Sequence, residues 1–182
     1  MNDKRLYSGE RLVKRTLKDL TAYQLYRYVS AYKYISSSDI VGDLGCGVGS
    51  GSYLLAKKAK KVIGFDNSSD AIQYARKYWI KDNIKYCCQD ILNIDYKFDI
   101  VVCNEVIEHI KHPNKLFQLF SKIVKSYLIF SIPTPNQKQK NKFHIKHYLP
   151  SEIKKFLKDN SFKLIRFDGM NLPFYVAKRI IE

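Results

Sequence analysis

The sequence predicts an α/β fold in which a doubly wound, mostly parallel sheet carries helices on both faces. Along most of the 182 residues, short apolar runs alternate with stretches of helical periodicity, a pattern typical of parallel strands joined by right-handed crossovers. A glycine-rich segment follows the first apolar run, where the first turn of such a sheet is expected. The last two apolar runs predict an antiparallel hairpin at the sheet edge.

We expect one domain over residues 1–182, with a helical lead-in at 1–38 and the core at 39–182. Leucine, valine and tyrosine recur at helical intervals over residues 10–35, which predicts one or two amphipathic helices there. The expected strands are 39–45, 61–66, 84–90, 98–104, 127–133, 161–169 and 173–179, and the expected later helices are 50–58, 69–78, 113–124 and 151–158.

Composition favours a cytoplasmic globular protein, in the host cytoplasm if the source is viral. Apolar residues make up 46% of the chain, and no apolar run reaches the roughly 18 residues that a membrane span needs. The N-terminal residues lack the apolar centre of a secretory signal. The four cysteines show no C-x-x-C spacing, so we expect reduced core residues and no disulfide or zinc framework.

The net charge of +15 raises the question of nucleic-acid binding, because Lys and Arg neutralise phosphates. The basic residues comprise 25 Lys and only 7 Arg, scattered along the chain. Arg is the side chain suited to bidentate contacts with phosphates and bases. The charge therefore favours a solvated lysine surface over a nucleic-acid groove.

The segment "DLGCGVGSG" at 43–51 places four glycines within nine residues. Neither frame of it fits the dinucleotide-binding pattern G-x-G-x-x-G, and no Lys-Ser or Lys-Thr follows it as in a triphosphate-binding loop. The remaining pattern is acid-x-G-x-G-x-G with Asp43 at the strand end. A carboxylate there repels a phosphate and favours an ammonium group.

The segment "VGDLGCGVGSG" resembles the first motif of class I S-adenosylmethionine-dependent methyltransferases. Further along, "VIGFDNS", "CCQDI" and "FDIVVCNEVIEHI" are similar to that family's second, third and fourth strand motifs, in order and spacing. The resemblance covers roughly residues 40–165, and "GERL" and "LYRYVSAYKYI" upstream are similar to a bacterial and viral subgroup found beside glycan genes. It implies a Rossmann-like, seven-stranded sheet and S-adenosylmethionine as cofactor.

The same resemblance assigns roles to single residues. Gly45 and Gly47 should let the backbone pass under the methionine part of the cofactor, where a Cβ would collide. Asp43 should hold the amino group, Asp66 the ribose hydroxyls and Asp90 the adenine amino group. Taken singly, Asp66 and Asp90 are also typical of helix caps and turns. The full implied cofactor-binding set is Asp43, Gly45, Cys46, Gly47, Phe65, Asp66, Asn67, Asp90, Ile91, Asn104 and Glu105.

The segment "EVIEH" sets Glu105, Glu108 and His109 at i, i+3 and i+4, on one face if a helix begins there. The loop after the strand at 127–133 returns His144 and His147 to the same sheet edge. Small-RNA 2′-O-methyltransferases and ubiquinone-pathway O-methyltransferases share E-x-x-E-H, where it is associated with a divalent metal. The resemblance implies a site for Mg²⁺ or a similar ion at Glu105, Glu108, His109 and His144.

The alternative is catalysis without a metal. "EVIEH" also occurs in methyltransferases for which no metal is known, where the first Glu lines the cofactor pocket and the His lies under the substrate. His144 would then be the base, since "FHIKHYLPSE" is similar to a segment that small-molecule and sugar methyltransferases carry after the fifth strand. The catalytic candidates are His144, His109 and Glu108, while we expect His112 and His147 at the surface.

These observations predict an S-adenosylmethionine-dependent O-methyltransferase that acts on a hydroxyl of a sugar, nucleotide-sugar or glycan. A metal-dependent RNA ribose 2′-O-methyltransferase is the first alternative, disfavoured because only about 35 residues separate His109 from His144. An inactive cofactor-binding partner or scaffold protein is the second. The expected partners are a small-molecule or sugar acceptor, with nucleic acid not favoured, no membrane and no indicated oligomeric state.

Overall fold

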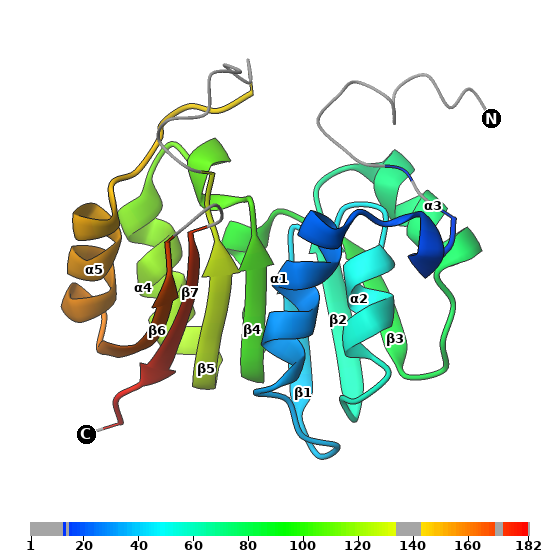
Figure 1. Ribbon diagram of the computed structural model, residues 1–182, viewed down its shortest axis with the longest axis horizontal. Helices are drawn as coiled ribbons and strands as arrows, with labels where there is room; N and C mark the ends of the chain where they lie inside the picture. Colours follow the sequence, from blue (N-terminus) through cyan, green and yellow to red (C-terminus); the bar gives the residue numbers. More distant parts are fainter. Residues whose placement is uncertain (1–12, 14, 134–142, 170–172, 182) are drawn as a thin grey trace. The chain divides into compact units, whose positions relative to one another are not determined.

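A computed structural model describes residues 13, 15–133, 143–169 and 173–181 (Figure 1). The chain forms two compact units, one ending at Asn93 and the other beginning at Ile94. The prediction of a single domain stays a prediction.

The first unit begins with the predicted helical lead-in. A 3₁₀ turn η2 at Leu17–Asp19 precedes helix α1 at Ala22–Tyr32. Thr21 caps α1, because its hydroxyl accepts from the Gln24 N–H at 3.3 Å and the Gln24 side chain accepts from the Thr21 N–H at 2.9 Å. Residues 10–12 and 14 of the predicted helical stretch lie outside the described residues.

Three parallel strands in the order β3-β2-β1 form the sheet of the first unit. Because parallel strands end at the same edge, the segments that follow all three strands gather there. The elements after α1 are β1 at Ile40–Leu44, α2 at Ser50–Leu55, β2 at Lys61–Asp66, α3 at Ser69–Tyr78, β3 at Ile84–Cys88 and the 3₁₀ turn η3 at Ile91–Asn93.

Four strands in the order β4-β5-β7-β6 form the sheet of the second unit, in which β4 and β5 are parallel and β7 is antiparallel to both β5 and β6. The core is rich in aromatic rings: Phe130 of β5 stacks on Tyr175 of β7 at 4.8 Å between centroids. The elements are β4 at Phe98–Asn104, the 3₁₀ turn η4 at Ile107–His109, α4 at Pro113–Ile123, β5 at Val124–Ser131, α5 at Pro150–Asp159, β6 at Phe162–Asp168 and β7 at Phe174–Arg179.

The predicted fold class is confirmed. All seven expected strands are present, five of them in parallel pairs and the last two antiparallel, with helices beside them. The main departure follows β4, where a helix starting at Glu105 was considered. Glu105 has a φ of +54°, which a right-handed helix excludes, and only the short turn η4 follows it.

Two further expectations concern burial and membranes. All four cysteines are free, but only Cys46 and Cys103 are buried. Cys88 is exposed, which corrects the expectation of four core thiols; it ends β3, the outermost strand of its unit. No helix in the described part of the chain combines the length and apolarity needed to span a bilayer.

Candidate functional site

The glycine-rich loop between β1 and α2 is bonded to the end of β2. The N–H groups of Gly45 and Cys46 both donate to the Phe65 carbonyl, at 2.8 and 2.9 Å. One residue further on, the Gly47 N–H donates to Oδ2 of Asp66 at 3.0 Å. The other carboxylate oxygen of Asp66 accepts from the Ser68 N–H at 2.9 Å, just before α3 begins. The loop and Asp66 are therefore placed together at the carboxyl end of the sheet.

Two positions of the loop require glycine for different structural reasons. Gly47 and Gly49 both have positive φ, at +54° and +92°. A Cβ at Gly49 would lie 2.7 Å from the Ala75 Cβ and 2.8 Å from the Tyr86 hydroxyl, so close packing excludes a side chain there. A Cβ at Gly47 would have no described atom within 4 Å. Gly47 thus borders open space, which a bound molecule can fill.

Asp43 is fully buried at the end of β1. The Ser52 hydroxyl donates to its Oδ2 at 2.6 Å, while Oδ1 has no hydrogen-bond partner among the described residues. Burial raises the pKa of the Asp43 carboxyl to about 7; the Ser52 hydrogen bond opposes this rise and the charge of Asp66 adds to it. A cationic donor reaching Oδ1 would favour the charged carboxylate.

The remaining predicted residues of the first unit follow β2 and β3. Asn67 is exposed, and its carbonyl accepts from the Cys88 thiol at 3.8 Å. Asp90 is exposed and accepts from the Leu92 N–H at 2.9 Å, which is the local turn role considered as its alternative. Ile91 is buried beside it. The nine predicted cofactor-binding residues of the first unit thus lie at or just after the carboxyl ends of three neighbouring strands.

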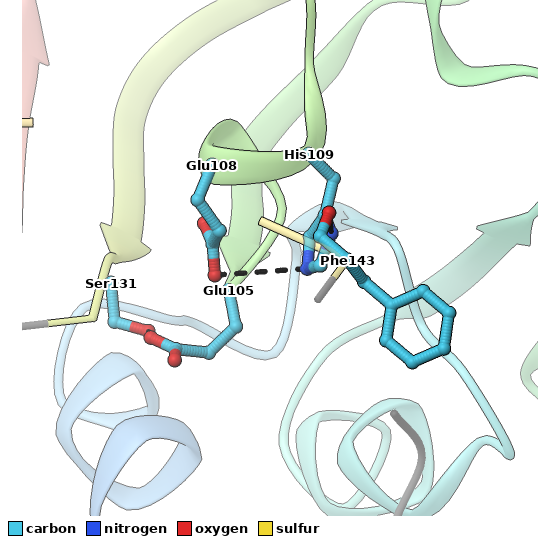
Figure 2. A network of polar contacts seen from close by, with 5 residues as sticks. All are labelled: Glu105, Glu108, His109, Ser131 and Phe143. Atoms are coloured by element: carbon cyan, nitrogen blue, oxygen red, sulfur yellow. Dashed lines mark hydrogen bonds and ion pairs between the residues drawn. The ribbon is translucent and has the colours of Figure 1, made fainter. Parts of the chain in front are cut away.

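The second unit holds the other predicted residues, beginning with Asn104 at the end of β4. Asn104 is 8% exposed, and neither atom of its side-chain amide has a hydrogen-bond partner among the described residues. Glu105 follows, and its N–H donates to the Ser131 carbonyl at 3.1 Å. The Ser131 hydroxyl in turn donates to Glu105 Oε1 at 2.9 Å (Figure 2). The Glu105 carboxylate is therefore held at the end of β5.

Glu108, His109 and His144 form a group in which one ligand-type atom of each lies within 4.8 Å of the others. The Glu108 side chain is fully buried, and its Oε1 lies 3.9 Å from Nε2 of His109. His109 Nδ1 lies 2.9 Å from the Phe143 carbonyl, which can only accept a hydrogen bond (Figure 2). In the neutral ring the proton is thus on Nδ1, and the lone pair of Nε2 faces the carboxylate.

The backbone explains why His144 reaches this group from a distant part of the chain. The N–H groups of Ile145 and Lys146 both donate to the Glu108 carbonyl, at 2.9 and 3.3 Å. With the His109–Phe143 contact, they fix residues 143–146 against η4. The predicted convergence of His144 with Glu108 and His109 is present in the structure.

Glu105 does not join these three side chains. It precedes η4 with a left-handed backbone, so the i, i+3, i+4 spacing does not place it on a common helix face. Its carboxylate accepts from Ser131 instead. Of the four residues predicted to form a metal site, the structure brings together one carboxylate and two imidazoles, a donor set that suits a divalent cation.

His147 departs from its predicted place at the surface. Its ring is half-buried and lies edge-on to His144, with 5.2 Å between ring centroids. His112, by contrast, is exposed at the start of α4, as expected. The H-x-x-H spacing of His144 and His147 is the sequence pattern that indicates their proximity. Both histidines flank Ile145 and Lys146, whose N–H groups are bonded to the Glu108 carbonyl.

A family described as "Methyltransferase domain" matches residues 35–170 of this chain. The chain is similar to ubiquinone biosynthesis O-methyltransferases from Glaesserella parasuis and Coxiella burnetii. The first is 32% identical over 108 residues, 54% of this chain and 46% of the relative, and the second is 38% identical over 88 residues, 46% and 38%. The chain thus spans less than half the length of these curated relatives.

Solved structures share the fold. The magnesium protoporphyrin IX methyltransferase of Synechocystis, solved with bound SAH, has a TM-score of 0.75 at 22% identity, covering 97% of this chain and 92% of that one. A putative methyltransferase of Bacillus halodurans has a TM-score of 0.71 at 20% identity, covering 81% and 72%. The predicted Rossmann-like architecture is confirmed by these likenesses.

We predict that Asp43 makes the stability of the chain fall with rising pH. Its pKa is about 7 in the folded chain against 3.8 in the unfolded one, so the folded chain binds the proton more tightly. The stabilisation is complete below about pH 4 and is lost as the pH rises to about 7, on the order of 4 kcal/mol. Urea unfolding of the wild type and of Asp43→Asn from pH 4 to 8 measures it. A wild-type curve parallel to that of Asp43→Asn would contradict the prediction.

Proposed function

This chain belongs to the family of methyltransferase domains, and on that premise we propose that it transfers a methyl group from S-adenosylmethionine to a hydroxyl of a small molecule. The observation that carries the proposal is the joint placement of the glycine loop and Asp66 at the carboxyl end of β2. The curated relatives, which are O-methyltransferases by name, support a hydroxyl as acceptor.

The first unit supplies the proposed cofactor contacts. Open space at Gly47 suits the methionine part, and the unsatisfied Oδ1 of buried Asp43 suits its ammonium group, directly or through water. Asp66, which already accepts two backbone N–H bonds, would also accept from the ribose hydroxyls. Asp90 and Ile91 would border the adenine. The residues of the loop therefore fit this cofactor by shape and charge.

The second unit supplies the proposed acceptor chemistry. The cofactor, when bound, presents a methyl group on a positively charged sulfur, so the chain must align a hydroxyl and remove its proton. We propose that Glu108, His109 and His144 would hold a divalent cation, which would supply positive charge that lowers the pKa of a hydroxyl. The acceptor O–H proton then passes to an imidazole or to water as the O–CH₃ bond forms and the S–CH₃ bond breaks.

The proposed acceptor differs from the one that the sequence predicts. A sugar or glycan hydroxyl was expected, but the comparisons give this no support, and the relatives are named for ubiquinone biosynthesis. We therefore place a ring hydroxyl of a quinone precursor ahead of a sugar. Short RNA stays the second candidate acceptor, because small-RNA 2′-O-methyltransferases share the E-x-x-E-H spacing of Glu105, Glu108 and His109.

The test is methyl transfer from labelled S-adenosylmethionine to a matched panel of dihydroxy-aromatic compounds, nucleotide-sugars, polysaccharide and short RNAs. We expect label in a small aromatic acceptor, and only weak RNA binding that is lost steeply as salt rises. Preferential labelling of RNA or of a nucleotide-sugar would contradict the acceptor assignment, and labelling of nothing would favour the scaffold alternative.

The same assay tests the cation. We expect turnover to fall on chelation and to return with a divalent metal, because the cation acidifies the acceptor hydroxyl. Glu108→Ala and His144→Ala should then be about equally damaging, since either loses a ligand. Turnover that survives exhaustive chelation, with His144→Ala much the worse variant, would leave His144 as a simple base.

Replacement of Asp66 should weaken S-adenosylmethionine binding. Asp66→Ala would leave the ribose hydroxyls and the Gly47 N–H without their charged acceptor, which costs about 1–3 kcal/mol, or roughly 5- to 150-fold in Kd. Isothermal titration measures it, with Asp82→Ala, an exposed acid in the turn before β3, as the matched control. Equal Kd values for the two variants would remove Asp66 from the site.

The two glycines with positive φ should separate binding from stability. Gly47→Ala adds backbone strain of about 1–3 kcal/mol. Its methyl group enters the open space that we assign to the methionine part of the cofactor, so cofactor affinity should fall well beyond what the loss of stability explains. Gly49→Ala collides with Ala75 and Tyr86 and should be the less stable variant. Thermal unfolding and titration of both compare them. Unchanged affinity in a folded Gly47→Ala would contradict the proposed cofactor position.

A further inference from the structure

The group of Glu108, His109 and His144 provides three ligand atoms, and the structure points to a different fourth member from the one the sequence predicted. We propose that His147 completes this cation site in place of Glu105. The inference rests on the proposed function, since it concerns the cation of that same site.

Glu105 is held away from the group by three features of its own surroundings. Its backbone has a φ of +54°, its N–H donates to the Ser131 carbonyl, and its carboxylate accepts from the Ser131 hydroxyl (Figure 2). The Ser131 hydroxyl occupies Oε1 at 2.9 Å and so holds the Glu105 carboxylate at the end of β5.

The ring of His147 packs against that of His144, and no comparable hydrogen bond holds its Nδ1 atom among the described residues. The His144 ring contacts both other imidazoles, with centroid separations of 5.0 Å to His109 and 5.2 Å to His147 and interplanar angles of 83° and 65°. The Nδ1 atom of His147 is shielded from solvent and has no hydrogen-bond partner among the described residues. A buried polar atom without a partner is destabilising, and a bond to a cation would offset that cost.

The backbone keeps His147 within reach. Ile145 and Lys146, between the two histidines, are both bonded to the Glu108 carbonyl, and α5 begins three residues after His147. The nitrogens of His147 are outside the set of atoms within 4.8 Å, so binding requires a turn of its side chain. The neighbouring Lys146 ammonium does not compete, because it pairs with Glu152 of α5 at 2.6 Å.

The change of ligand alters the expected metal. Two carboxylates and two imidazoles would accept Mg²⁺, whereas one carboxylate and three imidazoles favour Zn²⁺, Co²⁺, Mn²⁺ or Fe²⁺, because imidazole is a poor ligand for Mg²⁺. The site we propose is therefore a transition-metal site of Glu108, His109, His144 and His147.

The test is titration of the metal-free full chain with Co²⁺, followed by its visible absorption, which reports the ligands directly and needs no methyl acceptor. We expect His147→Asn to weaken Co²⁺ binding at least about ten-fold and to change the spectrum. His112→Asn, which removes an exposed imidazole, and Glu105→Gln should leave affinity and spectrum as in the wild type. A large excess of Mg²⁺ should not displace Co²⁺.

An unchanged spectrum and affinity in His147→Asn, or their loss in Glu105→Gln, would overturn the proposal. If His147→Asn does not fold, His147→Phe keeps a ring against His144 without a ligand nitrogen and carries the same expectation. S-adenosylmethionine binding is measured on the same samples. A wild type that binds the cofactor but no Co²⁺ overturns the cation site alone, whereas failure to bind the cofactor overturns the proposed function.

Discussion

The Phe65 carbonyl accepts hydrogen bonds from two consecutive N–H groups of the glycine loop, and this arrangement fixes the position of the loop at the carboxyl end of β2. It holds the loop against β2 so that the next N–H reaches the Asp66 carboxylate. Gly47 then turns with positive φ over open space, and Gly49 packs into the core against Ala75 and Tyr86. A side chain at either glycine would disturb the loop, for a different reason in each case.

In the second unit, too, one backbone carbonyl accepts hydrogen bonds from two consecutive N–H groups. The Glu108 carbonyl accepts hydrogen bonds from the N–H groups of Ile145 and Lys146. These two bonds hold the adjacent His144, which follows β5 in the chain, against the turn η4 that follows β4. The buried carboxylate of Glu108 and the fixed tautomer of His109 then face one another across 3.9 Å. Both units therefore position side chains by satisfying a carbonyl at a strand end or a turn, so that the polar groups depend on backbone geometry rather than on side-chain packing alone.

The fold could be predicted because local pattern and global topology agree. Buried runs such as residues 98–104 read as strands by composition alone, and the glycines of 45–49 stand where a parallel sheet places its first turn. The grouping of Glu108, His109 and His144 was predictable only in part, because Glu105, Glu108 and His109 share a face only if the backbone is helical. The positive φ of Glu105 and its bond to Ser131 are tertiary effects that no spacing rule contains. The half-buried position of His147 differs from the expected surface position for a related reason, since the neighbouring backbone at Ile145 and Lys146 is hydrogen-bonded to the Glu108 carbonyl.

The central claim is that the loop and the strand ends of the first unit select S-adenosylmethionine among adenine-containing cofactors. Their carboxylates at Asp43 and Asp66 favour an ammonium group and ribose hydroxyls, and they repel the phosphates of NAD and ATP. The most direct test is calorimetric titration of the full chain with S-adenosylmethionine, its demethylated product, NAD and ATP in one buffer. We expect saturable binding of the first two and none of the others; tighter binding of NAD than of S-adenosylmethionine would show that this assignment of the cofactor is wrong.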